Sequence, residues 1–223
     1  MFDIETAGQY PTWRDFVAED QKGSELFQKK YERMKWEDRY GDIDTAYLEN
    51  SPIISAYGRI CCISFGFLHE GQKRIKSFAG VNEKEILLDF KRMLEKIEKK
   101  NFSLSGYRIW HFDIPWILHK MHKYSIKPPS IISVYDKKPW ETRIVDLAED
   151  WKLKFAWTSS FDEVCYELGI ESPKDKIDGS DVHKRFHNGD IDDIIEYCEK
   201  DVAASLEMDI KIYQNGNAQT ISV

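Results

Sequence analysis

Several features that define other protein classes are scarce or missing in this chain of 223 residues. It has only four cysteines, with neither the CxxC spacing of a metal site nor the number needed for a disulfide framework. No apolar run approaches the roughly 20 residues of a membrane span. The chain starts without the basic and apolar regions of a signal peptide, so we expect a cytoplasmic protein with no membrane partner.

Positive charge is also in deficit, because 32 Lys and Arg stand against 39 Asp and Glu, a formal net charge of −7. This balance excludes a protein that coats nucleic acid through bulk positive charge. It is compatible with an enzyme that holds a few nucleotides in one cleft, where metal ions would cancel the local negative charge. No Gly-rich phosphate loop is present, which disfavours a nucleoside-triphosphate switch.

The adjacent Cys61 and Cys62 lie in an apolar run, residues 58–67, that is typical of a central strand. Alternation along a strand would place the two thiols on opposite faces, so we do not expect a disulfide between them. We expect all four cysteines to be buried reduced thiols.

The patterns that are present predict a mixed α/β fold. Hydrophobic residues make up 42% of the chain and aromatic residues 13%, enough for a sizeable core. Strand patterns cover residues 1–6, 58–67, 73–80, 102–110 and 142–147, and helical patterns cover residues 82–100, 112–124, 159–170 and 189–213. This order predicts a mixed central sheet flanked by helices, in one domain of residues 1–213 with a polar tail at 214–223.

Residues 12–50 interrupt this order with a charged stretch that contains Gly23 and Gly41. We expect one or two helical segments there, forming an insertion that lies over the core. A second interpretation gives Trp13, Trp36 and the basic residues of the insertion a role in stacking bases or following a single strand. The simple helical cover is the favoured interpretation.

The first residues, MFDIET, place two acids on one face of a strand. Asp3 and Glu5 share that face, while Phe2 and Ile4 point to the other. Acids are poor strand formers and repel each other, and a divalent cation would remove the repulsion. The alternative is an edge strand with a solvated acidic face.

The last predicted helix carries another acid that faces inward. Projected at about 100° per residue, Asp201 falls inside the apolar arc of the helix, and Tyr197 lies on its flank one turn earlier. A buried carboxylate needs a partner, which could be a Lys or Arg or a metal ion shared with Asp3 and Glu5. Tyr197 and Asp201 are four residues apart and would point into the same cleft.

A fourth candidate acid, Asp113, stands where the strand of residues 102–110 gives way to a helix. It could simply be an N-cap, but strand-to-helix junctions are common ligand sites in α/β sheets. Four carboxylates from three segments, with a tyrosine beside the last, suit a two-metal phosphoryl-transfer site.

Three motifs together resemble the DEDDy 3′–5′ exonucleases of the ribonuclease H-like fold. FDIET resembles the first motif of that family, GYRIWHFDIP the second and YCEKDV the third. More narrowly, LGIESPKDKIDGSDV followed by IIEYCEKDV resembles a bacterial group of predicted exonucleases related to the proofreading domain of family B DNA polymerases.

The resemblance implies a role for each acid and for the tyrosine. Two Mg²⁺ or Mn²⁺ ions would be bound, with Asp3 bridging both, Glu5 and Asp201 completing the ligands of the first ion and Asp113 holding the second ion largely through water. Tyr197 would orient the attacking water. The substrate would be nucleic acid with a free 3′ end, such as single-stranded DNA, released as nucleoside 5′-monophosphates.

The resemblance also implies substrate contacts from Thr6, Tyr107, Arg108 and Phe112. Tyr107 and Arg108 stand where the family often has His-Asn, so contacts in that loop differ from the family pattern. Two alternatives stay open: an oligoribonuclease-type enzyme acting on short RNA, and a nucleic-acid-binding module of the same fold with weak turnover. Protein partners are not predicted.

Other candidate residues rank lower. His183 and His187 have a zinc-type spacing of four, but without a third ligand nearby we expect surface histidines. Asp146 ends the strand of residues 142–147 and could approach the metals. His111 is expected to be structural or to face the substrate.

Overall fold

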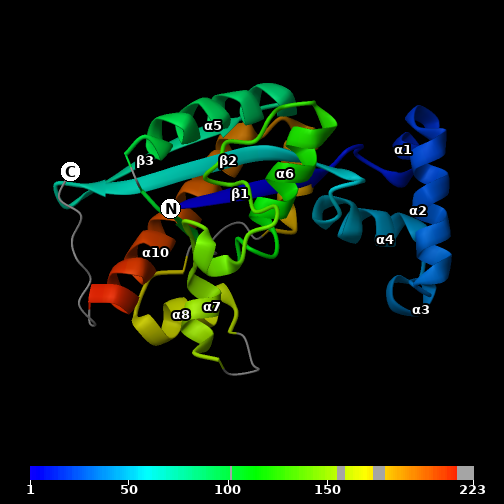
Figure 1. Ribbon diagram of the computed structural model, residues 1–223. Coiled ribbons are helices and arrows are strands. Elements are labelled where there is room, and N and C mark those ends of the chain that lie inside the picture. Colours follow the sequence, from blue (N-terminus) through cyan, green and yellow to red (C-terminus); the bar gives the residue numbers. More distant parts are fainter. Residues whose placement is uncertain (101, 155–158, 173–178, 215–223) are drawn as a thin grey trace.

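The computed structural model of this chain describes residues 1–100, 102–154, 159–172 and 179–214, and Figure 1 shows their arrangement. The strands are β1 Phe2–Gly8, β2 Gly58–His69, β3 Gln72–Ala79, β4 Leu104–Gly106 and β5 Ile144–Asp146. The α-helices are α1 Trp13–Glu19, α2 Gln21–Arg33, α3 Glu37–Tyr40, α4 Ile43–Asn50, α5 Glu83–Glu98, α6 Asp113–Lys123, α7 Leu147–Lys152, α8 Phe161–Leu168, α9 Asp181–Asn188 and α10 Ile191–Gln214. Two 3₁₀ turns are η1 Ser51–Ile53 and η2 Pro139–Glu141. The predicted mixed α/β fold is confirmed, and most of the predicted tail lies outside the described residues.

The sheet consists of two hydrogen-bonded pieces. β1, β2 and β3 form an antiparallel sheet in that order, and β4 pairs with β5 in parallel. The two pieces lie directly side by side, because a Cβ on Gly106 would be 2.7 Å from the carbonyl oxygen of Phe2. The strands follow one another along the chain in the predicted order. In the described residues, however, β1 and β4 are in contact without the regular hydrogen bonds that would make one continuous sheet.

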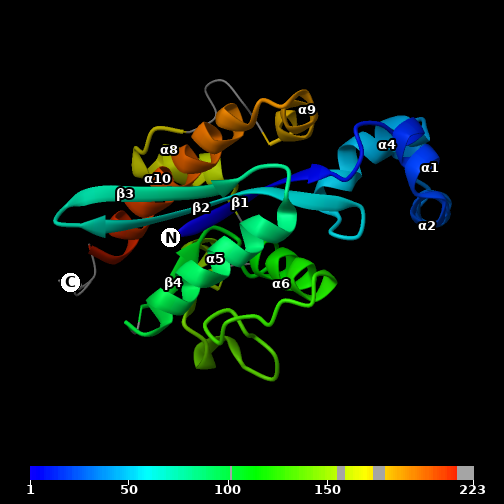
Figure 2. The same ribbon diagram turned by 90° about the horizontal axis from the view of Figure 1, so that it is seen from above.

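Helices cover both faces of the sheet, as Figure 2 shows from above. α5 and α6 lie on one face, and α8, α9 and α10 lie on the other. The side chains of β1 alternate accordingly: Phe2 and Ile4 are buried in the core formed with α5 and α6. Asp3 and Glu5 therefore face the side where α10 lies.

A β-bulge in β2 changes the expected orientation of the two adjacent cysteines. Glu5 pairs with Cys62 and Thr6 pairs with Ile60, so Cys61 is the extra residue of the bulge. Cys61 and Cys62 consequently lie in the same buried cluster, together with Cys198 of α10. The prediction of opposite faces was wrong because a bulge breaks the alternation, while the prediction of buried free thiols is confirmed.

Helix α10 packs closely on the middle of the sheet. A Cβ on Gly66 of β2 would lie 2.6 Å from Cγ1 of Val202, so only glycine allows the helix to approach this far. This packing brings the α10 side chains next to β1. None of the described helices is both long and apolar enough to cross a membrane.

The insertion at residues 12–50 forms four helices, α1 to α4, where the sequence predicted one or two. They lie beyond the end of the sheet, not over it, as Figures 1 and 2 show. The physical reason is an aromatic core inside the insertion itself, in which Phe16, Phe27 and Tyr47 are almost completely buried. Since the helices bury their apolar faces against one another, they do not need the sheet for cover.

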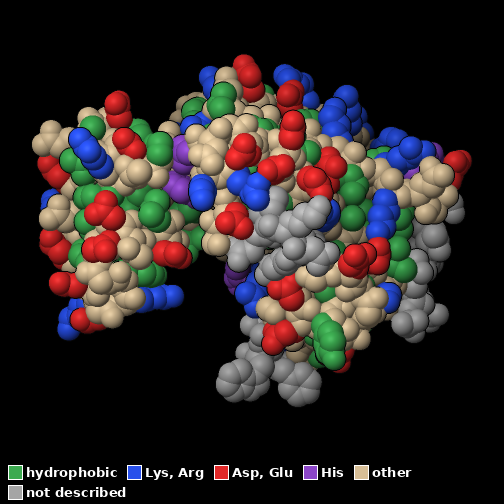
Figure 3. Space-filling model, turned by 180° about the vertical axis from the view of Figure 1, so that it is seen from behind, with side chains coloured by type: hydrophobic (Ala, Val, Ile, Leu, Met, Phe, Trp, Pro, Cys, Tyr) green, Lys and Arg blue, Asp and Glu red, His purple; other side chains and the backbone are tan. Residues whose placement is uncertain are grey.

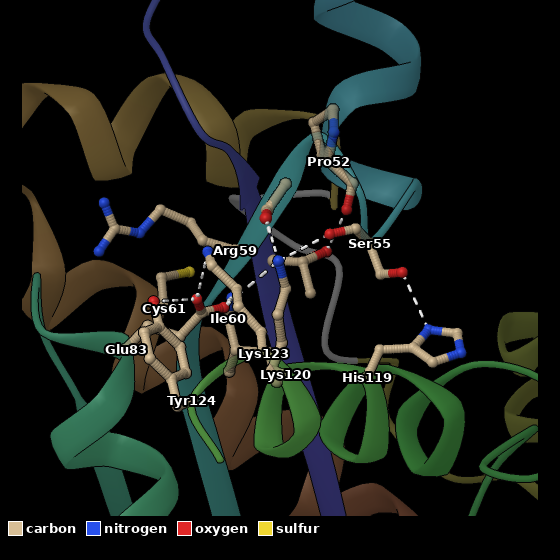
Figure 4. Close-up of polar contacts among 12 residues, drawn as sticks. Pro52, Ser55, Arg59, Ile60, Cys61, Glu83, His119, Lys120, Lys123 and Tyr124 are labelled. Atoms are coloured by element: carbon tan, nitrogen blue, oxygen red, sulfur yellow. Dashed lines mark hydrogen bonds and ion pairs between the residues drawn. The ribbon is translucent and has the colours of Figure 1, made fainter. Parts of the chain in front are cut away.

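A buried ion pair joins the end of the insertion to the rest of the fold (Figure 4). Lys120 of α6 donates to the carbonyl oxygens of Ser55, at 2.7 Å, and of Gly58, and its ammonium lies 3.8 Å from Glu83. Glu83 also accepts from the Ile60 amide, at 2.7 Å, and from the Tyr124 hydroxyl, at 2.8 Å. Burial lowers the pKa of Lys120 to about 8. This cluster connects α5, α6 and the start of β2.

Candidate active site

Two of the predicted acids, Asp3 and Glu5, lie side by side on β1. One carboxylate oxygen of each and the sulfur of Cys198 all lie within 4.8 Å of one another. Glu5 is buried and Asp3 is half-buried. The structure therefore places the two carboxylates together on the face predicted by alternation, in contact with α10.

Helix α10 supplies Tyr197 and Asp201 to the same place. Tyr197 is buried, and its hydroxyl is hydrogen-bonded to Asp201 one turn later. Burial, and then the negative charges of Asp201 and Glu5, raise the pKa of the Tyr197 hydroxyl far above its usual value. The phenol therefore stays protonated and remains a hydrogen-bond donor.

Asp113 arrives from the other face of the sheet, at the first position of α6. Phe112 holds the N-cap position without a side-chain capping bond, so Asp113 does not act as the N-cap. Its Oδ1 instead accepts the amide of Ile4 at 3.1 Å, which fixes the carboxylate against β1 between Asp3 and Glu5. The main chain of β1, the strand that carries Asp3 and Glu5, therefore holds the Asp113 carboxylate in place.

The electrostatics of the site show that the acids repel one another. Burial raises the pKa of Asp3 and of Glu5 well above the usual range, and the neighbouring carboxylates raise it further. Burial likewise raises the pKa of Asp113 to about 7. None of the salt bridges among the described residues includes Asp3, Glu5 or Asp113. Asp3 and Glu5 thus bring two carboxylate oxygens close together with no salt bridge in the described parts of the chain, which suits a divalent cation.

Cys198 is a neighbour of the acids that the sequence did not single out for this role. Its Sγ lies 3.5 Å from Oδ2 of Asp3 and 3.6 Å from the Asp3 carbonyl oxygen, and it donates to that carboxylate. Burial raises the pKa of the thiol well above its usual value, so it remains a donor. The helical projection places Cys198 on the same inward side as Asp201, and this was the feature of the sequence that could have indicated its contact with the acids.

The loop before Asp113 differs from the prediction. The strand expected over residues 102–110 ends at Gly106, and Arg108 adopts a left-handed φ of 58°. Asp146 organises this turn: its carboxylate accepts the amides of Arg108, at 2.9 Å, and Trp110, at 3.0 Å. It also accepts the amide of Ala148 at 3.0 Å as the N-cap of α7. Asp146 is therefore a buried scaffold for the loop.

The residues expected to contact substrate lie around the acids in different environments. Thr6 is buried, and its hydroxyl donates to the Pro52 carbonyl at 2.6 Å. Phe112 is half-buried, with its ring 5.7 Å from that of Trp116.

Tyr107 and Arg108 both reach the main chain ahead of α8. The Tyr107 hydroxyl donates to the carbonyl oxygen of Ser159 at 2.5 Å, and the Arg108 guanidinium donates to the same oxygen at 3.1 Å. The two side chains therefore connect the loop before Asp113 to the start of α8.

Of the histidine pair of α9, which was expected on the surface, one member is buried and the other, His187, is half-buried. His183 is buried: its Nδ1 accepts the Gly8 amide at 2.9 Å, and its Nε2 lies 3.0 Å from the Pro11 carbonyl oxygen. His187 Nε2 lies 3.0 Å from the Gly8 carbonyl oxygen. The two rings contact the last residue of β1, and His183 also contacts the segment after it, where the chain leaves the sheet and its polar groups need partners.

His111, by contrast, is largely exposed. Its Nε2 lies 3.4 Å from a carboxylate oxygen of Glu149 of α7. This contact links the loop before Asp113 to α7, and it leaves both expected roles of this histidine, structural or facing the substrate, as predictions.

A family model matches residues 52–213, and its description is a predicted 3′–5′ exonuclease related to the exonuclease domain of PolB. The match includes Asp113, Tyr197 and Asp201, while Asp3 and Glu5 precede it. No curated protein is significantly similar to the chain. Because the match spans well over half of the sequence, the chain belongs to this family of predicted 3′–5′ exonucleases related to the PolB exonuclease domain.

Proposed function

We propose that the protein is a divalent-metal-dependent 3′–5′ exonuclease that removes nucleoside 5′-monophosphates from the 3′ end of nucleic acid, preferably single-stranded DNA. The observation that carries this proposal is the pair of carboxylates of Asp3 and Glu5, which lie together on β1, feel the negative charges of Asp113 and Asp201, and form no salt bridge among the described residues. Membership of the exonuclease family agrees with it.

Asp3, Glu5, Asp113 and Asp201 would hold two Mg²⁺ or Mn²⁺ ions. Such ions, when bound, supply charge stabilisation at the scissile phosphate and acidify a coordinated water. The chain itself contributes the placement of the oxygens: the Ile4 amide positions Asp113, and Cys198 positions Asp3. Acids that hold protons in the free protein release them when a cation binds.

Tyr197 would orient the attacking water through its hydroxyl. The pKa of this phenol is raised strongly, so it donates a hydrogen bond and does not act as a base. Its bond to Asp201 fixes the ring beside the carboxylates. In this role the tyrosine touches the reacting water but is not a ligand of either ion.

The shape of the molecule is compatible with a single strand at the site. Figure 3 shows a hollow between the helical insertion and the rest of the protein. Residues 9–12 connect β1, which carries Asp3 and Glu5, to the first helix of the insertion. A frayed 3′ end is narrower than a duplex and would enter such a space more readily.

Asp201→Asn tests the proposal directly. A 5′-labelled single-stranded oligonucleotide should be shortened stepwise by the unaltered protein with Mn²⁺ or Mg²⁺, and Asp201→Asn should reduce the rate by at least about 10³-fold because an ion ligand is lost. Glu196→Gln, on the exposed side of the same helix, is the matched control and should keep full activity.

Metal removal gives an independent readout. Mn²⁺ should raise the melting temperature of the unaltered protein, since ligand binding stabilises the folded state, and EDTA should reverse the rise. Asp201→Asn should show a smaller rise. If the oligonucleotide is bound but never shortened at any divalent-ion concentration, the protein is a binding module, and faster digestion of a matched RNA strand would assign it to RNA.

A further inference from the structure

A thiol lies among the acids of the candidate active site. One carboxylate oxygen of Asp3, one of Glu5 and the sulfur of Cys198 lie within 4.8 Å of one another, and this group does not include Asp113 or Asp201. Cys198 is fully buried, and Glu5 is only 7% exposed. An ion held between Asp3 and Glu5 would therefore have a sulfur atom within reach as its third ligand.

The separation of sulfur and oxygen fits two ligands of one tetrahedral ion. Zn²⁺ binds cysteine sulfur at about 2.3 Å and carboxylate oxygen at about 2.0 Å, so at a tetrahedral angle these two ligands lie about 3.5 Å apart. The observed distance from Sγ of Cys198 to Oδ2 of Asp3 is 3.5 Å. The Glu5 oxygen lies at most 4.8 Å from either atom, a separation that rotation about the side-chain bonds of Glu5 can shorten.

The Glu5 carboxylate is a second observation that points to an ion. Its side chain forms no hydrogen bond and no salt bridge among the described residues, and the carboxylates around it, Asp3, Asp201 and Asp113, are negative like itself. A buried carboxylate without a partner is costly. A cation between Glu5 and Asp3 would supply the missing partner.

The thiol of Cys198 can become a ligand for one kind of ion only. Cysteine binds metals as the thiolate, and a coordinating cation removes the thiol proton outright. That proton passes to water, and the sulfur–metal bond replaces the hydrogen bond to Asp3. Thiolate ligands select ions such as Zn²⁺, whereas Mg²⁺ and Mn²⁺ prefer oxygen. With these harder ions the thiol stays a hydrogen-bond donor.

We propose that Asp3, Glu5 and Cys198 form a site for a thiophilic divalent cation such as Zn²⁺, and that Cys198 sets the preference for this ion over Mg²⁺ and Mn²⁺. Three protein ligands with water in the fourth position are the arrangement of open zinc sites. One consequence rests on the proposed exonuclease function. Zn²⁺ bound at this site withholds Asp3 and Glu5 from Mg²⁺ or Mn²⁺ and inhibits digestion.

Cadmium absorbance tests the sulfur–metal bond without any nucleic acid. Cd²⁺ is a thiophilic substitute for Zn²⁺, and its bond to a thiolate gives an ultraviolet charge-transfer band. Cd²⁺ titrated into the full chain, with its thiols reduced, should produce a band that saturates at one equivalent and that excess Zn²⁺ removes. Cys198→Ser and Cys198→Ala should both lack the band, so the test does not depend on the folding of a single variant.

The other cysteines provide matched controls. Cys62→Ser changes a thiol of the same buried cluster, and Cys165→Ser changes a buried thiol of a different cluster. Neither sulfur belongs to the group formed with Asp3 and Glu5. Both variants should therefore keep the Cd²⁺ band.

The affinities for two ions separate a metal ligand from a residue that only positions the acids. Loss of a group that supports metal ligands costs about 10–100-fold in affinity, and loss of a ligand should cost no less. Cys198→Ser should lower the Zn²⁺ affinity by at least about tenfold, measured by competition with a fluorescent zinc indicator. The Mn²⁺ affinity, measured by electron paramagnetic resonance, should change less, because serine keeps a hydrogen-bond donor for Asp3.

Inhibition relates the site to the proposed function. Zn²⁺ should slow the Mn²⁺-dependent digestion of a 5′-labelled oligonucleotide. Cys198→Ser should need at least about tenfold more Zn²⁺ to lose half of its own uninhibited rate. A protein that binds Cd²⁺ through Cys198 but digests no nucleic acid would contradict the exonuclease function and support the ion site.

Three outcomes would overturn the proposal. The first is the absence of a Cd²⁺ band in the unaltered protein. The second is a band that persists in both Cys198 variants, which would assign it to another cysteine. The third is an equal fall of the Zn²⁺ and Mn²⁺ affinities in Cys198→Ser, which would make the cysteine a positioning residue and not a ligand.

Discussion

The carboxylates of the site are held in an environment that favours their protonated forms while no cation is bound. Asp113 shows this most clearly, because burial raises its pKa from 3.8 to about 7. Water would stabilise the charged form of an isolated aspartate, but here the side chain is enclosed and faces other acids. The free protein therefore carries a cost at neutral pH that a divalent cation would remove.

This cost predicts a pH dependence of stability. The folded state binds the Asp113 proton more tightly than the unfolded state, so the contribution is fully present below about pH 4 and is lost as the pH rises through about 7. In EDTA, the free energy of unfolding of the unaltered protein should fall relative to that of Asp113→Asn between pH 5.5 and pH 8. Urea denaturation at both pH values measures the difference.

The contributions of His183 and His187 to the pH dependence cancel in the comparison with Asp113→Asn, because both proteins contain these histidines. A difference between the two proteins that stays constant with pH would contradict the raised pKa of Asp113. Adding Mn²⁺ at pH 8 should stabilise the unaltered protein more than the variant, since the variant has lost one ligand.

Tyr197 permits a separation of metal binding from catalysis. Tyr197→Phe removes the hydroxyl that would orient water but leaves every carboxylate in place. Turnover should fall by about 10²–10³-fold, the range for loss of one positioned hydrogen-bond donor, while the Mn²⁺-dependent rise in melting temperature persists. A variant that loses the rise as well would show that the tyrosine acts through the metal ligands.

At the scale of elements, the distance between α10 and β2 determines whether the acids meet. At Gly66 the helix lies close to the strand, because an added Cβ would be 2.6 Å from Val202 and 3.2 Å from Leu206. Gly66→Ala should push α10 outward and cost about 1–3 kcal/mol of stability, a typical overpacking penalty. Nuclease activity should fall by more than the loss of folded protein accounts for, because Tyr197 and Asp201 belong to the helix that moves.

Gly179→Ala provides the control for Gly66→Ala. A Cβ there would meet no atom within 4 Å, so stability and activity should both be unchanged. Thermal melts and the oligonucleotide assay measure both effects. Full activity of Gly66→Ala would mean that the site tolerates movement of α10.

At the scale of the whole molecule, the protein has separate apolar clusters. Phe27 lies in the aromatic core of the insertion, and Phe90 lies in the core between the sheet and α5. Each is fully buried, so truncation to Ala should cost about 3–5 kcal/mol in the cluster concerned. Hydrogen exchange should therefore rise within residues 12–57 for Phe27→Ala.

Phe90→Ala, in contrast, should accelerate hydrogen exchange in β1, β2 and α5, because Phe90 belongs to the core between these elements. Uniform acceleration over the entire chain by Phe27→Ala would show that the insertion and the sheet unfold together. The ion pair of Lys120 and Glu83 is the structural link that would transmit such coupling.

Local patterns predicted which face of each element carries the acids. Alternation placed Asp3 and Glu5 on one face of β1, and helical periodicity placed Asp201 inward beside Tyr197. Both rules depend only on the geometry of a single element, so they hold wherever that element is regular. The same geometry predicted the mixed α/β fold, because the order of strands and helices limits how they can pack.

Features that depend on contacts between residues far apart in the sequence were decided only by the tertiary structure. The bulge at Cys61, the bond from Ile4 to Asp113 and the bonds from the Arg108 and Trp110 amides to Asp146 each join segments that sequence patterns treat separately. The insertion folded on its own aromatic core for the same reason, since burial is decided by which surfaces find one another. Periodicity shows which side of an element is apolar, but only packing determines what lies against it.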